Sequence, residues 1–401
     1  IITGGPGTGK TTMINLIVRI FKQMGISVAL AAPTGRAAKR ITETSGVEAM
    51  TIHRLLEYVY SEDENEMEFG RNADNPLEED SFIVDEASMI DLMLMDGFLN
   101  ALQDESRLII VGDADQLPSV GAGNVLLDMI NSDYVPTIRL EEIFRQASES
   151  RIVVNAHSIN NGEYPESGGR DSDFFFMHRR GEEEIRETIE ELVTGRLESY
   201  YDFVRGNGDI QVLTPTRKGG LGTASLNEML QSIINPASEE INERKFGSKI
   251  FREGDKVMQI RNNYQMEWQQ LGRQSGRGIF NGDMGIINTI DNDNAKMVVD
   301  FDGRFVTYDS EEFDELELAY AVTVHKSQGC EFPVVIMPIS GFPPMLATRN
   351  LLYTAITRGK KLVILVGSEE RMHRMIDNNR IDERYTGLEA RLKEVDMGGL
   401  L

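Results

Sequence analysis

The chain of 401 residues contains a single cysteine, Cys330, and a single tryptophan, Trp268. One cysteine excludes an internal disulfide framework and suits a reducing compartment, so we expect a cytoplasmic location. No run of about 18 consecutive apolar residues occurs, which excludes an ordinary membrane-spanning helix. The sequence has no signal peptide, lacks an initiator Met and starts in an apolar stretch, so we expect further sequence to precede it.

Basic residues are also scarce. Lys and Arg total 41 against 65 Asp and Glu, which gives a net charge of −24. This charge argues against a protein that coats nucleic acid with a basic surface, so any nucleic-acid contact must come from local basic and aromatic groups in a groove. Residues 57–80 contain ten Asp or Glu against one Arg, which is typical of a solvated surface insertion.

What the sequence does contain begins with a P-loop, the glycine-rich loop that holds nucleotide phosphates. The pattern Gly4-x4-Gly9-Lys10-Thr11 follows an apolar stub and precedes an amphipathic helix predicted over 11–24, which is the setting that the motif requires. Lys10 would place a positive charge on the phosphates, and the Thr11 hydroxyl would bind Mg²⁺. The expected nucleotide contacts are Gly5, Pro6, Gly7, Thr8, Gly9, Lys10, Thr11 and Thr12.

Two apolar stretches that end in polar residues supply the remaining hydrolytic groups. FIVDEAS is a buried strand with two carboxylates at its C-terminal end, the edge of an α/β sheet where ligands bind. Asp85 would bind Mg²⁺, and Glu86 would orient or deprotonate the attacking water. RLIIVGDADQ ends in the same way, with Gln116 placed to sense the γ-phosphate. The sequence therefore predicts a nucleotide hydrolase.

Two pairs of short segments repeat in the same order. LAAPTGRAAK and TIHRLL in the first part correspond to VLTPTRKGGLG and TVHKSQG in the second. Pro33 precedes Thr51 by 18 residues and Pro215 precedes Thr323 by 108, so 108 − 18 = 90 additional residues separate the second pair. Two related α/β lobes, the second with an inserted domain, account for this pattern.

The inserted residues, 245–316, consist of short alternating strands separated by Gly-Asp, Asn-Gly and Asp-Gly turns, which predicts a small antiparallel β-barrel. Residues 261–277 of this segment hold three arginines, Tyr264 and Trp268 against one acid. Basic and aromatic groups together suit stacking on a single polynucleotide strand. The alternative is a polar hairpin with Trp268 in the core.

The second lobe has no P-loop, so one nucleotide would bind the first lobe and face the second. Arg145 and Arg358 are candidates for arginines that approach the γ-phosphate, although each alone is more commonly a surface ion pair. The matching Pro-Thr loops would form two sites that grip a polynucleotide backbone, one on each lobe. His53 and His325 would contribute to these two grips, unless the histidines are buried in the core. Two grips whose separation changes during each nucleotide cycle describe a stepping motor.

Taken in order, these motifs resemble superfamily 1 helicases, and specifically the RecD-like branch that includes RecD and TraA. The segments that carry the resemblance span nearly the whole chain: GGPGTGKTT, APTGRAAKR, TIHRLL, DEAS, GDADQLPSVGAG, LEEIFRQ, TPTRKG, VTVHKSQGCEF and LYTAITRGKK. The resemblance implies an α/β P-loop NTPase with two RecA-like parallel-sheet domains, a β-hairpin insertion in the first and a Src-homology-like β-barrel in the second. It also implies ATP-dependent 5′→3′ translocation on single-stranded DNA with duplex unwinding, in DNA repair or recombination.

The resemblance also assigns residues. It implies that Lys10, Thr11, Asp85, Glu86, Gln116, Arg145 and Arg358 line ATP, with Mg²⁺ at Thr11 and Asp85. It implies nucleic-acid contacts at Pro33, Thr34, Gly35, Arg36, Thr51, His53, Thr214, Pro215, Thr216, Arg217, Thr323, His325, Lys326 and Gln328, to which the barrel adds Trp268. The acidic insertion falls where the family has its strand-separating pin, and its charge suggests a steric wedge.

The expected domains are a first RecA-like domain over 1–150 with a pin-like hairpin in 57–80, a second over 151–244 and 317–401, and the barrel over 245–316. The expected partners are single-stranded DNA and junctions of single and double strands, with no membrane. A monomer is expected, with protein partners through the family's N-terminal domain, which precedes the P-loop and is absent here. The alternatives are an ATP-hydrolysing nucleic-acid switch or clamp without unwinding, and the helicase module of a conjugative relaxase.

Overall fold

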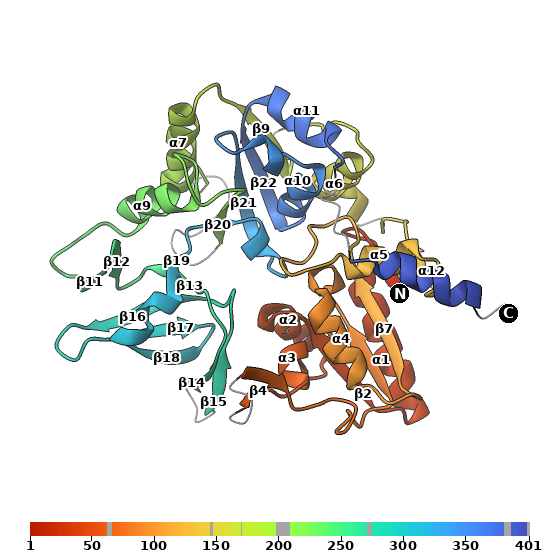
Figure 1. The fold of residues 1–401 in the computed structure, drawn as a ribbon. Coiled ribbons are helices and arrows are strands. Elements are labelled where there is room, and N and C mark those ends of the chain that lie inside the picture. The colour runs from red at the N-terminus through yellow and green to blue at the C-terminus, as the bar shows by residue number, and fades with distance from the viewer. Residues whose placement is uncertain are drawn as a thin grey trace. The chain divides into compact units, whose positions relative to one another are not determined.

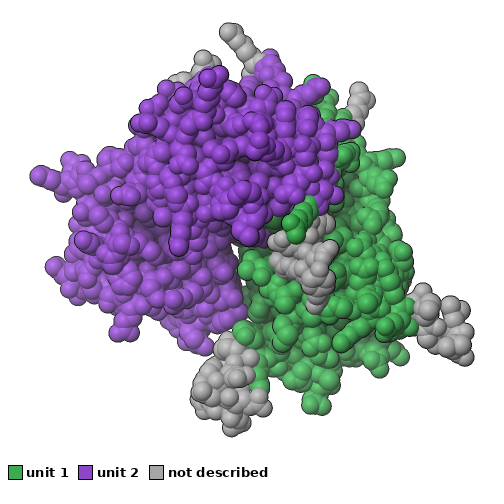
Figure 2. Space-filling model, turned by 45° about the horizontal axis from the view of Figure 1, so that its top comes forward, with its two compact units in different colours: residues 1–161, 380–401 green, residues 162–379 purple. Residues whose placement is uncertain are grey.

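The structure is a computed structural model that describes residues 1–61, 66–144, 147–169, 171–197, 209–270, 275–380 and 386–398. The chain divides into two compact units (Figure 2). The first comprises Ile1–Asn161 with Arg380–Leu401, and the second comprises Gly162–Asn379. Among the described residues, the helices are all too short or too polar to cross a membrane.

The first unit is built on a six-stranded sheet in which all neighbouring strands are parallel (Figure 1). In sheet order the strands are β3 (Ala49–Thr51), β2 (Val28–Ala32), β6 (Ser81–Val84), β7 (Arg107–Gly112), β1 (Ile2–Gly4) and β8 (Ile138–Leu140). Every residue of β6 is buried, because a parallel sheet is covered on both faces. This explains why the strand before the two carboxylates is a continuous apolar run.

Helices pack on this sheet through two separate groups of buried side chains. Ile14 and Ile41 belong to one group, and Leu126 and Phe98 belong to the other. The helices of the unit are α1 (Lys10–Met24), α2 (Gly35–Ser45), α3 (Ile52–Leu55), α4 (Leu92–Asn100), α5 (Val125–Asn131), α6 (Arg151–Asn160) and α12 (Leu388–Gly398), with short 3-10 turns η1 (Ala87–Met89) and η2 (Ala147–Glu149). The loops at the carboxyl ends of the strands therefore connect strands and helices that are fixed by the core.

The predicted hairpin insertion is confirmed. Strands β4 (Tyr58–Ser61) and β5 (Glu66–Phe69) pair antiparallel, with Tyr58 opposite Phe69. The rings of His53 and Tyr58 are 5.4 Å apart, and Phe69 lies so close to Gly97 of α4 that a Cβ there would be 2.4 Å from the ring. An aromatic cluster therefore anchors the base of the hairpin to α3 and α4.

The second unit contains a five-stranded parallel sheet and a seven-stranded antiparallel sheet. The parallel sheet consists, in order, of β20 (Ala321–Thr323), β10 (Ile210–Thr214), β21 (Phe332–Ile339), β22 (Gly359–Gly367) and β9 (Phe174–His178). Its helices are α7 (Glu182–Glu191), α9 (Thr223–Ile234), α10 (Arg349–Ile356) and α11 (Glu369–Asp377), with the π-helical turn η3 (Leu192–Arg196) and the 3-10 turns η5 (His325–Ser327) and η6 (Pro344–Leu346). The predicted fold of two parallel α/β sheets is confirmed.

The strand registers explain the repeated sequence segments. In the first unit β2 pairs parallel with β3, so that Ala32 lies opposite Thr51. In the second unit β10 pairs parallel with β20, so that Thr214 lies opposite Thr323. In each unit the residue before the Pro-Thr loop is thus aligned with the first residue of the Thr-x-His segment. The two loops emerge side by side at the same sheet edge in both units, although 90 additional residues separate the second pair.

The antiparallel sheet accounts for those additional residues and confirms the predicted barrel insertion. In sheet order its strands are β15 (Ser275–Ile279), β14 (Asn263–Gln270), β18 (Arg304–Asp309), β17 (Lys296–Phe301), β16 (Met284–Asp291), β13 (Lys256–Gln259) and β19 (Leu316–Leu318), with the 3-10 turn η4 (Ser310–Glu315) before β19. A hairpin of β11 (Glu243–Phe246) and β12 (Lys249–Arg252) precedes it. Alternate residues of β16, β17 and β18 are buried, as the period-2 pattern predicts.

A buried carboxylate joins the barrel to the parallel sheet of the same unit. Asp255 is fully buried and accepts hydrogen bonds from Gln231 Nε2 (2.6 Å), Asn235 Nδ2 (2.8 Å), Tyr320 Oη (2.9 Å) and the backbone N–H of Arg252 (2.7 Å). Burial raises the pKa of Asp255, while the hydrogen bonds from these groups oppose the rise. The network holds α9, β12 and β20 together and positions the cleft described below.

The C-terminal helix differs from the expected domain division. Residues 380–401 were expected in the second domain, but α12 packs on α5 of the first unit, where Leu388 contacts the core. The Thr386 hydroxyl donates a hydrogen bond of 3.1 Å to Asp128. The expected division followed chain order and therefore assigned this helix to the second domain. The apolar residues of a terminal helix do not themselves specify which unit they cover, so the sequence could not reveal the contact with α5.

Candidate nucleotide and polynucleotide sites

The P-loop connects β1 to α1 in the first unit. Gly7 and Gly9 adopt left-handed backbone conformations with φ of 74° and 89°, which favour glycine. The Thr8 hydroxyl donates to the Gly5 carbonyl at 2.9 Å and closes the loop from inside. Gly9 caps α1 without a side chain, so the first N–H groups of the helix have no acceptor from the cap residue. Such a helix start is suited to a phosphate.

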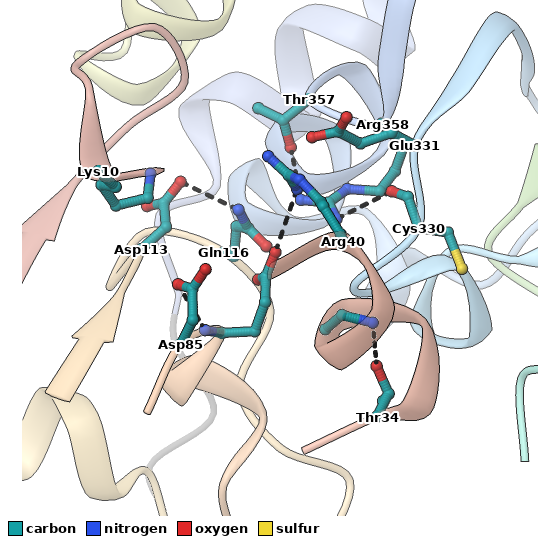
Figure 3. Close-up of polar contacts among 12 residues, drawn as sticks. Lys10, Thr34, Arg40, Asp85, Asp113, Gln116, Cys330, Glu331, Thr357 and Arg358 are labelled. Atoms are coloured by element: carbon teal, nitrogen blue, oxygen red, sulfur yellow. Dashed lines mark hydrogen bonds and ion pairs between the residues drawn. The ribbon is translucent and has the colours of Figure 1, made fainter. Parts of the chain in front are cut away.

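Lys10 bends back over this loop (Figure 3). Its Nζ donates to the carbonyl oxygens of Gly4 at 2.5 Å and Gly5 at 2.9 Å. These bonds keep the ammonium group at the loop that would hold phosphates. The side chain is only partly buried, so it can exchange a carbonyl for a phosphate oxygen without disturbing the core.

Asp85 and Glu86 follow β6, as predicted. The Glu86 backbone N–H donates to Asp85 Oδ1 at 2.8 Å, and Glu86 has the left-handed φ of 54° that non-glycine residues rarely adopt. Burial and then the charge of Glu86 raise the pKa of Asp85 to about 6, against the opposing charges of Lys10 and Arg40. A crowded pair of carboxylates of this kind favours a bound cation, which would relieve the repulsion.

Gln116 lies in the loop after β7, the strand between β6 and β1, and its side chain contacts Asp113 (Figure 3). Its Nε2 donates to Asp113 Oδ2 at 3.1 Å, and Asp115 in the same loop accepts from Asn160 of α6 at 2.8 Å. Within the described residues, the buried Gln116 Oε1 accepts no hydrogen bond. A buried acceptor without a donor is costly, so this oxygen fits a water or ligand donor. Both aspartates thus accept hydrogen bonds from amide side chains of the same unit.

These residues fit a nucleoside triphosphate with Mg²⁺. A Cβ at Gly7 would lie 2.8 Å from Ala147 Cβ, so the loop depends on glycine there, and the buried Gln116 oxygen has room in its hydrogen bonding for a donor. Among the described residues, no group of three or more His, Cys, Asp and Glu side chains forms a metal cage of its own. A Mg²⁺ at a nucleotide site commonly takes one or two carboxylates and fills its other positions with phosphate oxygens and water.

Two residues that the sequence did not single out complete the P-loop surroundings. Phe144 donates its backbone N–H to the Gly7 carbonyl at 3.1 Å, and its ring lies against Gly9. His157 Nε2 is 3.0 Å from the Pro6 carbonyl oxygen. Both belong to the stretch that follows β8, where Phe144 directly precedes the candidate Arg145. Arg145 itself lies outside the described residues, so its role stays a prediction.

Arg358 follows α10 in the second unit and is buried. Its guanidinium donates to the carbonyl oxygens of Cys330 at 3.1 Å and Thr354 at 3.3 Å, and to the Thr357 hydroxyl at 3.4 Å (Figure 3). The second unit therefore holds this side chain in a defined position. Its expected contact with the γ-phosphate stays a prediction.

In the first unit, the expected polynucleotide contacts lie at two helix starts. The Thr34 hydroxyl accepts from the Ala37 N–H at 3.3 Å and caps α2, and the Thr51 hydroxyl accepts from the Arg54 N–H at 3.1 Å and caps α3. These hydroxyls shape the loops from within. Pro33, Gly35 and Arg36 are partly exposed beside them. Burial lowers the pKa of His53, against the charge of Asp91, which fits its place in the aromatic cluster and the alternative of a buried histidine.

In the corresponding loops of the second unit, threonine hydroxyls also form hydrogen bonds to the backbone of their own loops. The fully buried Thr214 hydroxyl donates to the Leu221 carbonyl at 2.7 Å, so it supports the loop from beneath. Thr216 donates to the Lys218 carbonyl at 3.3 Å, and the Thr323 hydroxyl accepts from the Lys326 N–H at 3.3 Å. Pro215 and Gln328 are buried, whereas Arg217, His325 and Lys326 retain exposed surface. These three side chains are accessible candidates in this unit, and the expected contact of Pro215 would have to be made by the surface of its loop.

A cleft of about 680 Å³ opens beside these loops. Arg217, Lys218 and Lys249 line it together with the carboxylate of Glu317. Glu317 pairs with Arg217 and, at 3.0 Å, with Lys326. Burial acts to raise the pKa of Glu317, but Lys326, Arg217 and Lys249 outweigh it and lower the pKa. The sequence did not single out Lys249 or Glu317, because strands of the inserted barrel bring them to the loops.

Trp268 packs within the barrel. It lies opposite Gly276 of β15, and its ring covers this glycine so closely that a Cβ there would be 2.4 Å from Cζ2. The Arg304 guanidinium lies 6.0 Å from the ring centroid. The partly buried ring contacts the barrel core, which is the alternative that the sequence left open. A contact between Trp268 and DNA stays a prediction.

Three family matches follow the same order as the structural parts. Residues 1–122 match the AAA domain family, residues 226–301 match the ATP-dependent RecD-like DNA helicase SH3 domain, and residues 318–366 match the UvrD-like helicase C-terminal domain. The first match covers the P-loop and both carboxylates. The second match falls on the predicted insertion.

Solved structures share the fold. The structure of Pif1 helicase from Bacteroides in complex with ADP-AlF3 and ssDNA aligns with a TM-score of 0.54 over 99% of this chain and 93% of that chain, at 19% identity. Pif1 helicase from Candida albicans aligns with a TM-score of 0.53 over 99% and 95%, at 18% identity. At these identities the likeness concerns the fold alone.

Sequence relatives extend beyond this chain. The ATP-dependent RecD2 DNA helicase of Deinococcus radiodurans is 36% identical over 92% of this chain, which spans only 47% of that relative. The RecBCD enzyme subunit RecD of Mycolicibacterium smegmatis is 29% identical over 98% of this chain and 72% of the relative. With the RecD-like SH3 match inserted between two helicase-type lobes, these relatives settle the family: the chain belongs to the RecD-like branch of the superfamily 1 DNA helicases.

Proposed function

We propose that this chain is the motor region of an ATP-dependent DNA helicase that moves 5′→3′ along single-stranded DNA and unwinds duplex. The observation that carries the proposal is the combination of one hydrolytic site with two equivalent loop pairs. Asp85 and Glu86 follow β6, Gln116 follows β7 and the P-loop follows β1, which are three neighbouring parallel strands. The registers of Ala32 with Thr51 and of Thr214 with Thr323 place equivalent loop pairs in both units. A single nucleotide site with two grips suits stepping along a polymer.

The residues divide the hydrolytic work between them. Lys10 and the P-loop N–H groups would bind the phosphates, and Thr11 with Asp85 would hold Mg²⁺, which neutralises charge on the phosphate oxygens. Glu86 would take a proton from the attacking water, and the free Gln116 oxygen would orient that water. Arg145 and Arg358 would stabilise charge that develops on the γ-phosphate.

The proposed polymer is single-stranded DNA, with junctions of single and double strands as the substrate for unwinding. The Pif1 relatives of similar fold include one bound to ssDNA and one described at forked dsDNA. In this chain the exposed Arg217 and the partly exposed Arg36 and Lys326 would contact phosphates. Lys249 adds a further charge in the cleft. The hairpin of β4 and β5, with its acidic sequence, would act as a wedge at the junction, because acid there repels phosphates.

The biological setting is proposed as DNA repair or recombination in the cytoplasm, with this chain as a monomer. Relatives named as subunits of the RecBCD enzyme support a protein partner as well.

The polarity of unwinding tests the proposal. Three duplexes of equal sequence are compared: blunt, with a 5′ single-stranded tail, and with a 3′ tail. We expect ATP-dependent strand separation of the 5′-tailed duplex alone, because the motor loads on single strand and moves toward the junction. Unwinding of only the 3′-tailed duplex would reverse the proposed direction, and DNA-stimulated hydrolysis without unwinding would indicate a switch or clamp. The full-length protein is preferred for the assay.

Glu317→Gln is expected to tighten binding of single-stranded DNA about three- to tenfold at low salt. The substitution removes a negative charge from the cleft and releases Arg217 and Lys326 for phosphates, and such gains diminish as salt rises. Fluorescence anisotropy with a labelled oligothymidylate at several salt concentrations measures the effect. Glu370→Gln, which removes an exposed ion pair with Arg374 on α11, is the matched control. Unchanged or weaker binding by Glu317→Gln would contradict this reading of the cleft.

A further inference from the structure

One contact links the expected polynucleotide loop of the first unit to its catalytic carboxylate. Arg40 Nη1 of α2 lies 3.7 Å from Glu86 Oε1 (Figure 3). The Glu86 side chain is mostly buried, with 13% exposed, whereas 39% of the Arg40 side chain is exposed. The ion pair connects the Pro-Thr loop with the Asp85–Glu86 motif. The helix that begins after Pro33 and Thr34 places the positive charge of Arg40 next to Glu86, the proposed base.

Helix α2 is a capped helix that is packed along one face into the core of the first unit. Ala37, Ala38 and Ile41 bury one face against α1 and the sheet, in the same core group as Ile83 of β6. Thr34 caps the first turn and fastens the loop to the helix. Arg40 lies six residues beyond Thr34, or about 9 Å along the helix axis. The loop and Arg40 are therefore joined by one continuous helix, so that a displacement of the loop would also displace Arg40.

The orientation of the pair indicates the sign of its effect. A general base acts through an oxygen lone pair that points at the attacking water. The ion pair instead directs Glu86 Oε1 toward α2. The left-handed backbone at Glu86 requires surrounding contacts to hold it, and such strained positions cluster at active sites and switch regions.

We propose that Arg40 is a positioning residue that restrains Glu86 and releases it when a polynucleotide phosphate backbone binds the loop at Thr34–Arg36. This rests on the proposed function of the loop and deepens it by giving the route through which DNA stimulates hydrolysis. Arg40 contacts no phosphate in this scheme. Its effect is transmitted through the orientation of the Glu86 carboxylate.

The test compares ATP hydrolysis by Arg40→Gln and Arg40→Lys with the unaltered chain, each without DNA and with saturating oligothymidylate. For Arg40→Gln we expect the DNA-independent rate to rise about two- to fivefold, the effect of a partly exposed ion pair, while the stimulated rate changes little. The stimulation ratio then falls by the same factor. The DNA concentration for half-maximal stimulation should stay within about twofold, because phosphate contacts are kept. Arg40→Lys retains the charge and should restore part of the ratio.

Lys39→Gln on the same helix is the matched control, since it removes an exposed charge next to Arg40. Thermal unfolding of each variant reports whether the fold is retained. An unchanged DNA-independent rate for Arg40→Gln, or an equal loss of both rates, would overturn the proposal. The absence of any DNA stimulation in the unaltered chain would count against the proposed function instead, while the DNA-independent rates would still decide whether Arg40 restrains Glu86.

Discussion

Replacing Glu86 with glutamine is expected to lower ATP turnover about a thousandfold, within the range that a positioned general base supplies. Glutamine has nearly the same shape and keeps an oxygen for Arg40, but it cannot accept a proton from water. The Glu86 side chain, 13% exposed, follows β6, and the neighbouring carboxylate of Asp85 is assigned to Mg²⁺ in the proposed scheme. ATP binding should change by no more than a few fold, because Glu86 is not expected to contact the phosphates.

Single-turnover hydrolysis and equilibrium binding of a fluorescent ATP analogue separate the two effects. Glu105→Gln is a suitable control, since Glu105 is an exposed carboxylate in the loop before β7. If Glu86→Gln retained more than a tenth of the turnover, another group would have to act as the base. A loss of nucleotide binding equal to the loss of turnover would instead mean that Glu86 helps to hold Mg²⁺.

Lys10→Ala should impair both binding and turnover, with turnover reduced about 100- to 1,000-fold. A preorganised charge on transferring phosphate contributes several kcal/mol in a dry site, and alanine removes it entirely. The substitution also removes the bonds from Nζ to the Gly4 and Gly5 carbonyls. Those bonds are only partly buried, so the fold should persist and the melting temperature should change by a few degrees at most.

The control for this variant is Lys22→Ala in the last turn of the same helix, α1. Circular dichroism, nucleotide binding and hydrolysis are measured on both variants. Hydrolysis by Lys10→Ala within tenfold of the unaltered chain would remove Lys10 from the phosphate site. Equal losses in the two variants would point to helix stability as the cause.

The parts of the site that sequence predicts are those whose chemistry depends on local backbone. The P-loop needs left-handed glycines at Gly7 and Gly9 and a helix that starts at once, and both requirements are visible in consecutive letters. The apolar run before Asp85 and Glu86 predicts a strand covered on both faces, which places the carboxylates at a sheet edge. The repeated Pro-Thr and Thr-x-His segments predicted two lobes, because equivalent strand pairs need equivalent sequences at their ends.

The role of Trp268 was ambiguous for the opposite reason. An aromatic residue among arginines suits stacking on DNA, and it equally suits a strand that must cover a glycine. Only the register of β14 against β15 places the ring over Gly276. Sequence patterning places a side chain on one face of a strand, but it does not identify the residue that lies across from it.

The amino-acid sequence by itself determined the P-loop, the carboxylate-bearing strand, the twin lobes and the inserted barrel, since each follows from short-range periodicity and from what a few consecutive residues can adopt. Tertiary structure alone decided that Arg40 meets Glu86, that Glu317 pairs with Arg217, that His157 reaches Pro6, and that the last helix packs on α5. The partners in these contacts come from different elements, and Glu317 and Arg217 are 100 residues apart in the chain. Charged and polar side chains carry no periodic signal for such pairing, so only the packing of the surrounding apolar residues brings them together.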